Sequence, residues 1–291
     1  MRPSGLTYLY LAIMLVIWAS NWPLMKLALA DAPPLMFVFA RLIGTLAVLV
    51  PVLLAVHEPL WPARGERLGI AWVGLLQVAG FLICGIIGLA IVPAGRAIVL
   101  AFTMPLWAIP IGLWLWREPI GRWQLTGAVL GFAGLVLFMN PSLVDWRDGR
   151  VLGGNGLLLS AAICWALGSC LYRRRSWRTP FWTQTFWQMA ASTIPAVGAA
   201  VMAYGGTMHW TAGLIAILAY NCILANALGY FLWGRVLAVM PPVLAGQVLA
   251  LTPIGGFVIS ALMFGGALTI DIVVSIVLIV VGIGLSLRKS G

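Results

Sequence analysis

The sequence predicts an all-α integral membrane protein with ten transmembrane helices, arranged as two inverted five-helix repeats. The first observation behind this prediction is composition: 63% of the 291 residues are apolar and 8% are charged, with a mean hydropathy of +1.06. A soluble chain carries about a quarter charged residues. The second observation is a series of apolar stretches long enough to span a bilayer, and the third is an internal repeat.

Each apolar stretch comes close to the roughly 20 helical residues that cross a bilayer core. Polar or Pro/Gly-containing breaks separate them. The expected spans are 7–29, 34–56, 67–90, 94–116, 122–139, 153–172, 181–204, 211–237, 242–264 and 270–288. The longest polar stretch, 141–152, is expected to be a periplasmic linker between a first unit, 1–140, and a second unit, 153–291.

The internal repeat has an offset of about half the chain. Pro105 and Pro253 align at an offset of 148 residues, and Trp18 and Trp165 align at an offset of 147. These offsets also pair Pro93 with Pro241, Ala97 with Ala245, Gly134 with Gly282 and Arg41 with Gln188. The sequence therefore predicts one five-span unit written twice.

The basic residues predict the orientation, because Lys and Arg collect in cytoplasmic loops. With the N-terminus in the cytoplasm, twelve lie in inner loops and ends: Arg2, Arg64, Arg67, Arg117, Arg122, Arg173, Arg174, Arg175, Arg178, Arg235, Arg288 and Lys289. Three lie in outer loops: Arg96, Arg147 and Arg150. Both termini are therefore expected in the cytoplasm, and a second unit that follows five spans must be inverted. The net charge of +10 then reflects contact with the bilayer rather than with nucleic acid.

The four cysteines, Cys84, Cys164, Cys170 and Cys222, all fall inside apolar spans, with no CxxC pair or Cys/His cluster. No metal, cofactor or disulfide framework is therefore expected. The start of the chain looks like a signal peptide, but its apolar region is too long and contains Trp18, Asn21 and Lys26. We expect it to be an uncleaved first span.

Several stretches resemble a known family. They are Trp18-Ala19-Ser20-Asn21 to Lys26, Leu35 to Arg41, the Pro-containing fourth span that ends in Arg117-Glu118-Pro119, the fifth span with Gly127, Gly131 and Gly134, and Gly156 to Trp165-Ala166. In this order they resemble the drug/metabolite transporter superfamily, in particular its ten-span family of paired EamA-type units. The resemblance implies an inner-membrane exporter that works by alternating access, with amino acids and related metabolites as the first expectation and amphipathic drugs as the second. One departure is that Glu118 aligns with Gly266, where related units often carry a second acid.

Charged residues inside a span are costly and are functional candidates by default. Arg41 lies about seven residues into the second span, and Lys26 lies near the outer end of the first. Both could hold a substrate carboxylate or phosphate. Alternatively, Arg41 could pair with backbone carbonyls or Asp31 at an outer gate, and Lys26 could simply reach the interface.

Polar and aromatic residues at depth are the other candidates for the substrate site. The amides and hydroxyl are Asn21, Gln77, Thr103, Gln188 and Asn226, and the tryptophans are Trp18, Trp107 and Trp165. Each could instead be helix-packing material, because interhelical amide bonds stabilise bundles modestly and Trp normally sits at interfaces. As a group, they could line a cavity for a solute with an apolar side and a polar end.

Gating is expected at Lys26, Pro105, Glu118 and Pro253, since prolines interrupt helical hydrogen bonds. No Asp, Glu or His falls in the middle of a span, which favours a uniporter, exchanger or facilitator over a built-in proton relay, although a titrating substrate or Asp31 could still couple protons.

No catalytic motif supports the rival class, an intramembrane enzyme. The small-molecule substrate and the bilayer are the expected partners, with the chain a monomer or a homodimer.

Overall fold

A computed structural model describes residues 5–117, 121–139, 147–202, 206–241, 245, 248–249, 251–264 and 269–286. This part of the chain contains helices and no strand. Six stretches are long and apolar enough to cross a membrane: Gly5–Ala28, Pro34–Ala55, Arg67–Ile91, Arg96–Leu115, Gly149–Arg174 and Ala212–Leu237. The all-helical membrane class is thus confirmed, while the count of ten spans stays a prediction.

The helices of the first half often continue into one another. They are α1 (Gly5–Ala28), α2 (Pro34–Ala55), α3 (Arg67–Val73), a π-helical segment η1 (Gly74–Gly80), α4 (Phe81–Ile91), α5 (Ala94–Ala101), α6 (Met104–Trp116) and α7 (Arg122–Met139). Helices α3, η1 and α4 form one uninterrupted rod. The rod of α5 and α6 is interrupted just before Pro105, where the proline ring supplies no amide hydrogen to continue it.

The second half repeats this order. Its helices are α8 (Gly149–Arg174), α9 (Phe181–Met202), α10 (Ala212–Tyr220), a π-helical segment η3 (Asn221–Leu228), α11 (Gly229–Leu237), α13 (Thr252–Phe264) and α14 (Ile270–Ser286). Helix α8 begins four residues before the expected start at 153. The cause is Asp148, whose carboxylate caps the helix by accepting from the backbone nitrogens of Arg150 (2.8 Å) and Val151 (3.4 Å).

Helix boundaries recur at the offset found in the sequence. Helices α2 and α9 are both 22 residues long and begin 147 residues apart, at Pro34 and Phe181. The two π-helical segments also begin 147 residues apart, at Gly74 and Asn221. A π-helical segment is rare and often marks a functional site. Its occurrence at matching places means that the two halves share local geometry as well as sequence pattern.

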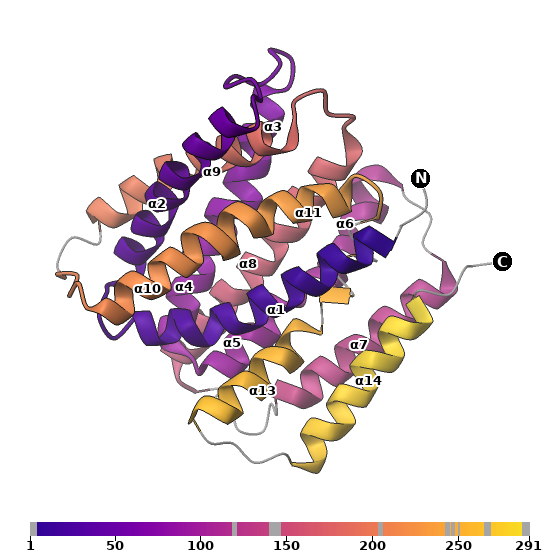
Figure 1. Ribbon diagram of the computed structural model, residues 1–291. Helices are drawn as coiled ribbons and strands as arrows, with labels where there is room; N and C mark the ends of the chain where they lie inside the picture. The colour runs from indigo at the N-terminus through magenta and orange to yellow at the C-terminus, as the bar shows by residue number, and fades with distance from the viewer. Residues whose placement is uncertain are drawn as a thin grey trace.

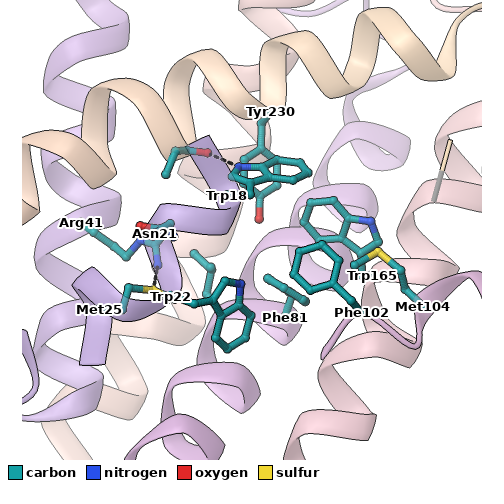
Figure 2. Close-up of a pocket in the computed structure, with 12 residues that line it drawn as sticks. Trp18, Asn21, Trp22, Met25, Arg41, Phe81, Phe102, Met104, Trp165 and Tyr230 are labelled. Carbon is teal, nitrogen blue, oxygen red and sulfur yellow. Dashed lines mark hydrogen bonds between the residues drawn. The ribbon is translucent and has the colours of Figure 1, made fainter. Parts of the chain in front are cut away.

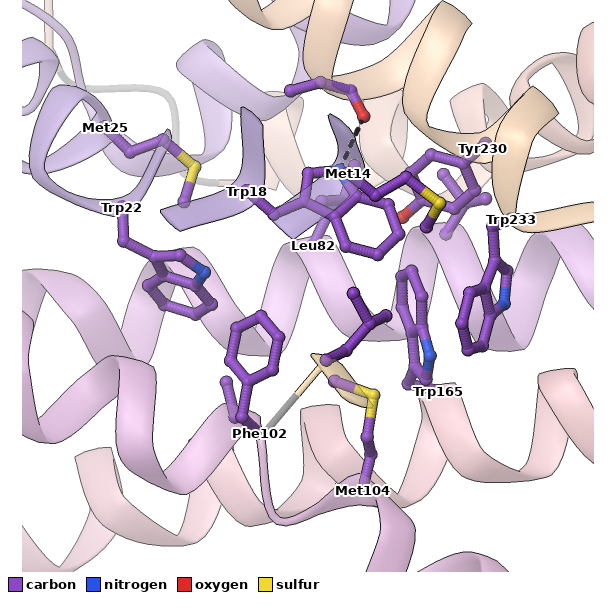
Figure 3. Close-up of a cluster of buried hydrophobic side chains, with 14 of the residues drawn as sticks. Met14, Trp18, Trp22, Met25, Leu82, Phe102, Met104, Trp165, Tyr230 and Trp233 are labelled. Carbon is purple, nitrogen blue, oxygen red and sulfur yellow. Dashed lines mark hydrogen bonds between the residues drawn. The ribbon is translucent and has the colours of Figure 1, made fainter. Parts of the chain in front are cut away.

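Figure 1 shows α1 and α8 running through the middle of the bundle, with α2 beside α9 at one edge and α7 beside α14 at the other. Helix α1 begins and α14 ends on the same side. The approach of α7 to α14 requires glycine, because a Cβ at Gly282 would lie 2.5 Å from the carbonyl oxygen of Gly127 and 2.7 Å from the nitrogen of Gly131. The centre of the bundle is a cluster of buried aromatic and methionine side chains, including Met14, Trp18, Trp165 and Trp233 (Figure 3).

Loops of the two halves are tied together at both ends. At one end, the α2–α3 loop holds the start of α9: Glu58 accepts from the backbone nitrogen of Thr183 (3.0 Å), and Glu66 accepts from the backbone nitrogens of Arg178 (2.7 Å) and Thr179 (2.9 Å). At the other end, Thr211 donates its hydroxyl to the Asp31 carboxylate at 2.8 Å. Asp31 therefore binds a neighbouring loop, and it is not the partner of Arg41.

Candidate substrate site

A small cavity lies at the centre of the bundle, among helices of both halves (Figure 2). Its aromatic lining consists of Trp18, Trp22, Phe81, Phe102, Trp165 and Tyr230, and the remaining lining consists of Asn21, Met25, Arg41, Leu82, Met104 and Ala225. Its volume is about 30 Å³. Pockets for drug-sized ligands run from about 300 to 1,000 Å³, and one water needs about 10–15 Å³. In this conformation the cavity is too small for an amino acid, and a solute could enter only after the walls moved apart.

Arg41 supplies the charge of this cavity. It is 2% exposed on α2, and its guanidinium donates to the Asn226 amide oxygen at 2.6 Å and contacts the Met25 sulfur at 3.0 Å. Its Nε has no partner. No carboxylate within the described ranges pairs with it, and the buried polar residues there include no Asp or Glu. A buried cation without an opposite charge is costly, so this site is suited to an anionic group.

Asn226 positions Arg41 from the second half. It lies in η3, is fully buried, and donates its amide nitrogen to the Thr45 hydroxyl at 3.0 Å. Thr45 in turn donates to the Arg41 carbonyl at 2.5 Å. Asn226 is absent from the cavity wall, so the structure places it behind Arg41 rather than against a solute.

Trp18 and Trp165, equivalent residues of α1 and α8, meet at the cavity. Their rings lie 5.3 Å apart in an edge-to-face arrangement. Trp18 donates to the Ala225 carbonyl at 3.0 Å, and Gly229 makes room for it, because a Cβ there would lie 2.7 Å from the indole nitrogen. The indole nitrogen of Trp165 and the amide oxygen of Asn21 are buried without partners. The cavity thus contains a donor and an acceptor in addition to the Arg41 cation.

Tyr230 is the main residue that the sequence reasoning missed. It is 5% exposed, its ring lies 5.4 Å from that of Trp165, and its hydroxyl donates to the Gln77 carbonyl at 3.3 Å. Trp22, Phe81 and Phe102 were also missed. Nothing in their sequence context separates them from ordinary core aromatics, although the repeat could have drawn attention to the helix that carries Tyr230.

Gln77 and Gln188 line a neighbouring cavity of about 10 Å³ rather than the central one. Gln77, in η1, donates to the Ser169 hydroxyl at 2.9 Å. Tyr230 lines both cavities and therefore lies between them. The structure thus places these two amides in the cavity next to the one that Arg41 lines.

The remaining candidates lie elsewhere. Thr103 and Pro105 line a peripheral cavity against α7, and half-buried Trp107 donates to the Thr103 hydroxyl at 3.2 Å, so these three are not brought to the central cavity. Lys26 donates to the carbonyls of Leu89 (2.6 Å) and Val92 (3.2 Å), which joins α1 to the end of α4. Pro253 is buried in the first turn of α13, and Glu118 lies outside the described residues.

An all-helical bundle of apolar spans around a buried cationic cavity is typical of membrane transport proteins. The sequence pattern of the EamA-like transporter family matches residues 5–140 and again 152–288, and the chain belongs to this family. Over 99% of the chain and 93% of the relative, it is 28% identical to the "Uncharacterized transporter YvbV" of Bacillus subtilis. It is 26% identical to a "Probable amino-acid metabolite efflux pump" of Salmonella typhimurium, over 93% of the chain and 91% of the relative.

A protein of that same description from Escherichia coli is also 26% identical, over 96% of the chain and 95% of the relative. A crystal structure of a protein with 16% sequence identity superimposes with a TM-score of 0.81, covering 99% of this chain and 97% of the other. At that identity the likeness shows a shared fold.

Proposed function

We propose that this transporter exports amino acids or related carboxylate-bearing metabolites across the bacterial inner membrane by alternating access. In this proposal the ten spans form two inverted five-helix units, 1–140 and 153–291, joined by the periplasmic linker 141–152. Both termini face the cytoplasm, and the solute binds at the centre, between the units.

The observation that carries the proposal is the buried Arg41 guanidinium at an aromatic cavity, which has no carboxylate partner among the described residues. A substrate carboxylate at Arg41 would supply the missing negative charge and would accept a charge-assisted hydrogen bond from the guanidinium. The unpartnered Asn21 oxygen and the aromatic faces would accept an ammonium group. An apolar side chain would then contact Trp22, Phe81 and Phe102. Arg41 and Asn21 therefore suit a zwitterion better than a dication.

The repeat supports alternating access. In transporters built from inverted repeats, the substrate site lies near mid-membrane where the repeats meet, and the halves rock around it. Here equivalent tryptophans of α1 and α8 meet at the cavity, and the cavity itself is too small to hold a solute unless the walls move apart. The relatives described as amino-acid metabolite efflux pumps support the solute class. The apolar walls also favour amphipathic drugs as a second solute class.

The first experiment measures transport in proteoliposomes that contain only this protein, with phenylalanine, leucine, alanine, lysine and an uncharged amphipathic drug as solutes. We expect counterflow of the large apolar amino acids and little of lysine. Arg41→Gln should lower kcat/KM for amino acids by about 30-fold, the order expected when a buried charge contact worth about 2 kcal/mol is lost. Thr45→Val is the control, because it perturbs the same hydrogen-bond network and leaves the charge in place.

Transport of the uncharged drug alone, equally fast in wild type and Arg41→Gln, would contradict the amino-acid proposal and favour the second solute class. A uniform loss with a lowered melting temperature in Arg41→Gln would instead assign Arg41 a role in folding only.

The second experiment tests the inverted topology. In a variant without the four native cysteines, Asp148→Cys should react with an impermeant thiol reagent added to intact cells, and Arg174→Cys should not. Both positions are exposed, so labelling reports the side of the membrane rather than burial. Labelling of Arg174→Cys and not of Asp148→Cys would overturn both the orientation and the inverted arrangement.

A further inference from the structure

A larger cavity lies at the end of the bundle where α8 passes into α9. Its volume is about 390 Å³, within the range of small-molecule pockets, whereas the volume of the central cavity, about 30 Å³, is that of one or two water molecules. The last turn of α8, the loop 175–180, the first turn of α9 and the end of α11 form its walls. We call this cavity the vestibule.

The vestibule is strongly basic. Arg173, Arg174, Arg175 and Arg178 line it, and the Arg235 guanidinium lies 4.9 Å from the ring of Phe181 in the wall. Among the described contacts, the Glu66 carboxylate lies against this wall: it accepts from the backbone nitrogens of Arg178 and Thr179 and interacts electrostatically with Arg178. Its single negative charge is outnumbered by the guanidinium groups of the wall, so the vestibule keeps an excess of positive charge.

The wall of the vestibule is held in shape by its aromatic residues. The rings of Tyr172 and Trp177 stack at 5.4 Å, and the Trp177 indole nitrogen donates to the Tyr172 carbonyl at 2.8 Å. The Arg175 guanidinium lies 5.9 Å from the Trp177 ring. These contacts keep the loop folded against α8, so the cationic groups form a concave site rather than a loose tail.

The floor of the vestibule contains a buried acceptor. Gln184 is 2% exposed, and its amide nitrogen donates to the Thr179 carbonyl at 2.5 Å, while its amide oxygen has no partner. An unsatisfied buried carbonyl oxygen carries a desolvation cost that a donor such as an ammonium group removes. The site thus offers cations at its walls and an acceptor at its floor.

The vestibule also adjoins the interior of the protein. Tyr172, Phe181 and Gln184 line both the vestibule and the small cavity that contains Gln188 and Tyr230. Tyr230 lines the central cavity as well. The three cavities therefore follow one another from the end of the bundle to Arg41, with Gln184 at the first boundary.

We propose that the vestibule is a second binding site, which captures an amino-acid zwitterion before it reaches Arg41. The carboxylate binds the guanidinium groups around Arg173 and Arg178, and the ammonium donates to the Gln184 oxygen. The side chain packs against Phe181. This inference rests on the proposed function for the identity of the solute, but the vestibule can be tested without transport.

The experiment measures equilibrium binding of labelled phenylalanine to the full chain in phosphatidylcholine nanodiscs, with the central site disabled by Arg41→Gln. We expect binding to remain and to weaken about 5- to 10-fold between 20 mM and 500 mM salt, because exposed guanidinium groups are screened. Adding Arg173→Gln and Arg178→Gln should abolish this binding. Adding Arg64→Gln and Arg122→Gln instead removes equal charge from exposed residues outside the vestibule, and should preserve it.

The ammonium contact is tested by comparing phenylalanine with 3-phenylpropionate, which lacks the ammonium group. Phenylalanine should bind about 5-fold better, and Gln184→Met should remove this preference. If Gln184→Met does not fold, the two ligands are compared on the protein that retains Gln184. Equal binding of phenylalanine and 3-phenylpropionate would then overturn the zwitterion site.

Other outcomes separate this inference from the proposed function. Loss of all phenylalanine binding in Arg41→Gln, or equal weakening by both arginine pairs, overturns the vestibule site and leaves the central site untouched. Salt-sensitive binding in the absence of any transport by the wild type supports the vestibule and contradicts the proposed function. If phosphatidylglycerol in the nanodisc displaces phenylalanine, a lipid headgroup occupies the arginines and capture of the solute is overturned.

Discussion

The two halves of the chain share a scaffold and differ in charge. Arg41 and Gln188 are each the eighth residue of a 22-residue helix, α2 and α9, and they are 2% and 5% exposed. One presents a cation to the central cavity, and the other presents a neutral amide to the small cavity beside it. The repeat therefore supplies equivalent backbone positions, and the substitution of one side chain turns one of them into a candidate anion site.

The same contrast appears at other equivalent pairs. Trp18 satisfies its indole nitrogen with a carbonyl of the second half, whereas the indole nitrogen of Trp165 has no partner. Lys26 caps the end of α4, whereas Arg173, which the same offset of 147 residues pairs with Lys26, lines the vestibule. A fully symmetric bundle would present the same binding groups to a solute from either side of the membrane. The departures from symmetry give the molecule a cationic centre and one strongly basic end.

The largest expected effect comes from moving the central charge to the other half. In Arg41→Gln/Gln188→Arg the composition is unchanged, but the new cation faces a cavity of about 10 Å³ beside Gln77 and Tyr230. We expect amino-acid transport in proteoliposomes to fall by about 30-fold or more, and Gln188→Leu alone to keep most activity. Wild-type rates in the exchanged variant would mean that the two positions are functionally equivalent.

An intermediate effect is expected where α7 meets α14. A Cβ at Gly282 would collide with backbone of Gly127 and Gly131, and overpacking of this kind costs about 1–3 kcal/mol. Gly282→Ala should lower the melting temperature in detergent by several degrees. Gly284, two residues further along α14, has nothing within 4 Å of its would-be Cβ, and Gly284→Ala should leave the melting temperature unchanged or slightly raised. Equal melting temperatures for both variants would show that the helices are not closely packed.

The smallest expected effect is a pH dependence at the end that carries Glu66. Burial alone would raise the pKa of this carboxyl, but hydrogen bonds from the Thr179 hydroxyl and from the backbone of residues 178 and 179 outweigh it, and the pKa is lowered. A lowered pKa in the folded state contributes stability above the ordinary value of about 4.3, and this stability is lost as the pH falls through the folded-state pKa.

Glu66→Gln should therefore lower the melting temperature slightly at pH 7 and leave it close to wild type at pH 3. Thr211→Val, which removes the hydroxyl that Asp31 accepts at the opposite end, is the matched comparison. A Glu66→Gln deficit that is the same at both pH values would show that the carboxylate charge does not stabilise the start of α9.

Much of the architecture could be predicted from the sequence, because bilayer insertion and a tandem repeat leave one-dimensional signals. The apolar composition indicated a membrane protein, and the offset that paired Trp18 with Trp165 also pairs the starts of α2 and α9. Arg41 could be singled out because a cation at depth is costly in any membrane fold. These inferences needed only the order of the residues.

Only the tertiary structure decided which side chains share the cavity. Thr103 and Trp107 are at a plausible depth, yet Thr103 lines a cavity against α7 and Trp107 donates to it, while Tyr230, Trp22 and Phe81 line the central cavity. Depth along a span follows from counting residues, but direction around the helix axis depends on helix crossing, on the interruption before Pro105 and on the π-helical segments, each of which rotates the residues that follow. Chain order therefore determined the class and the repeat, and packing determined the site.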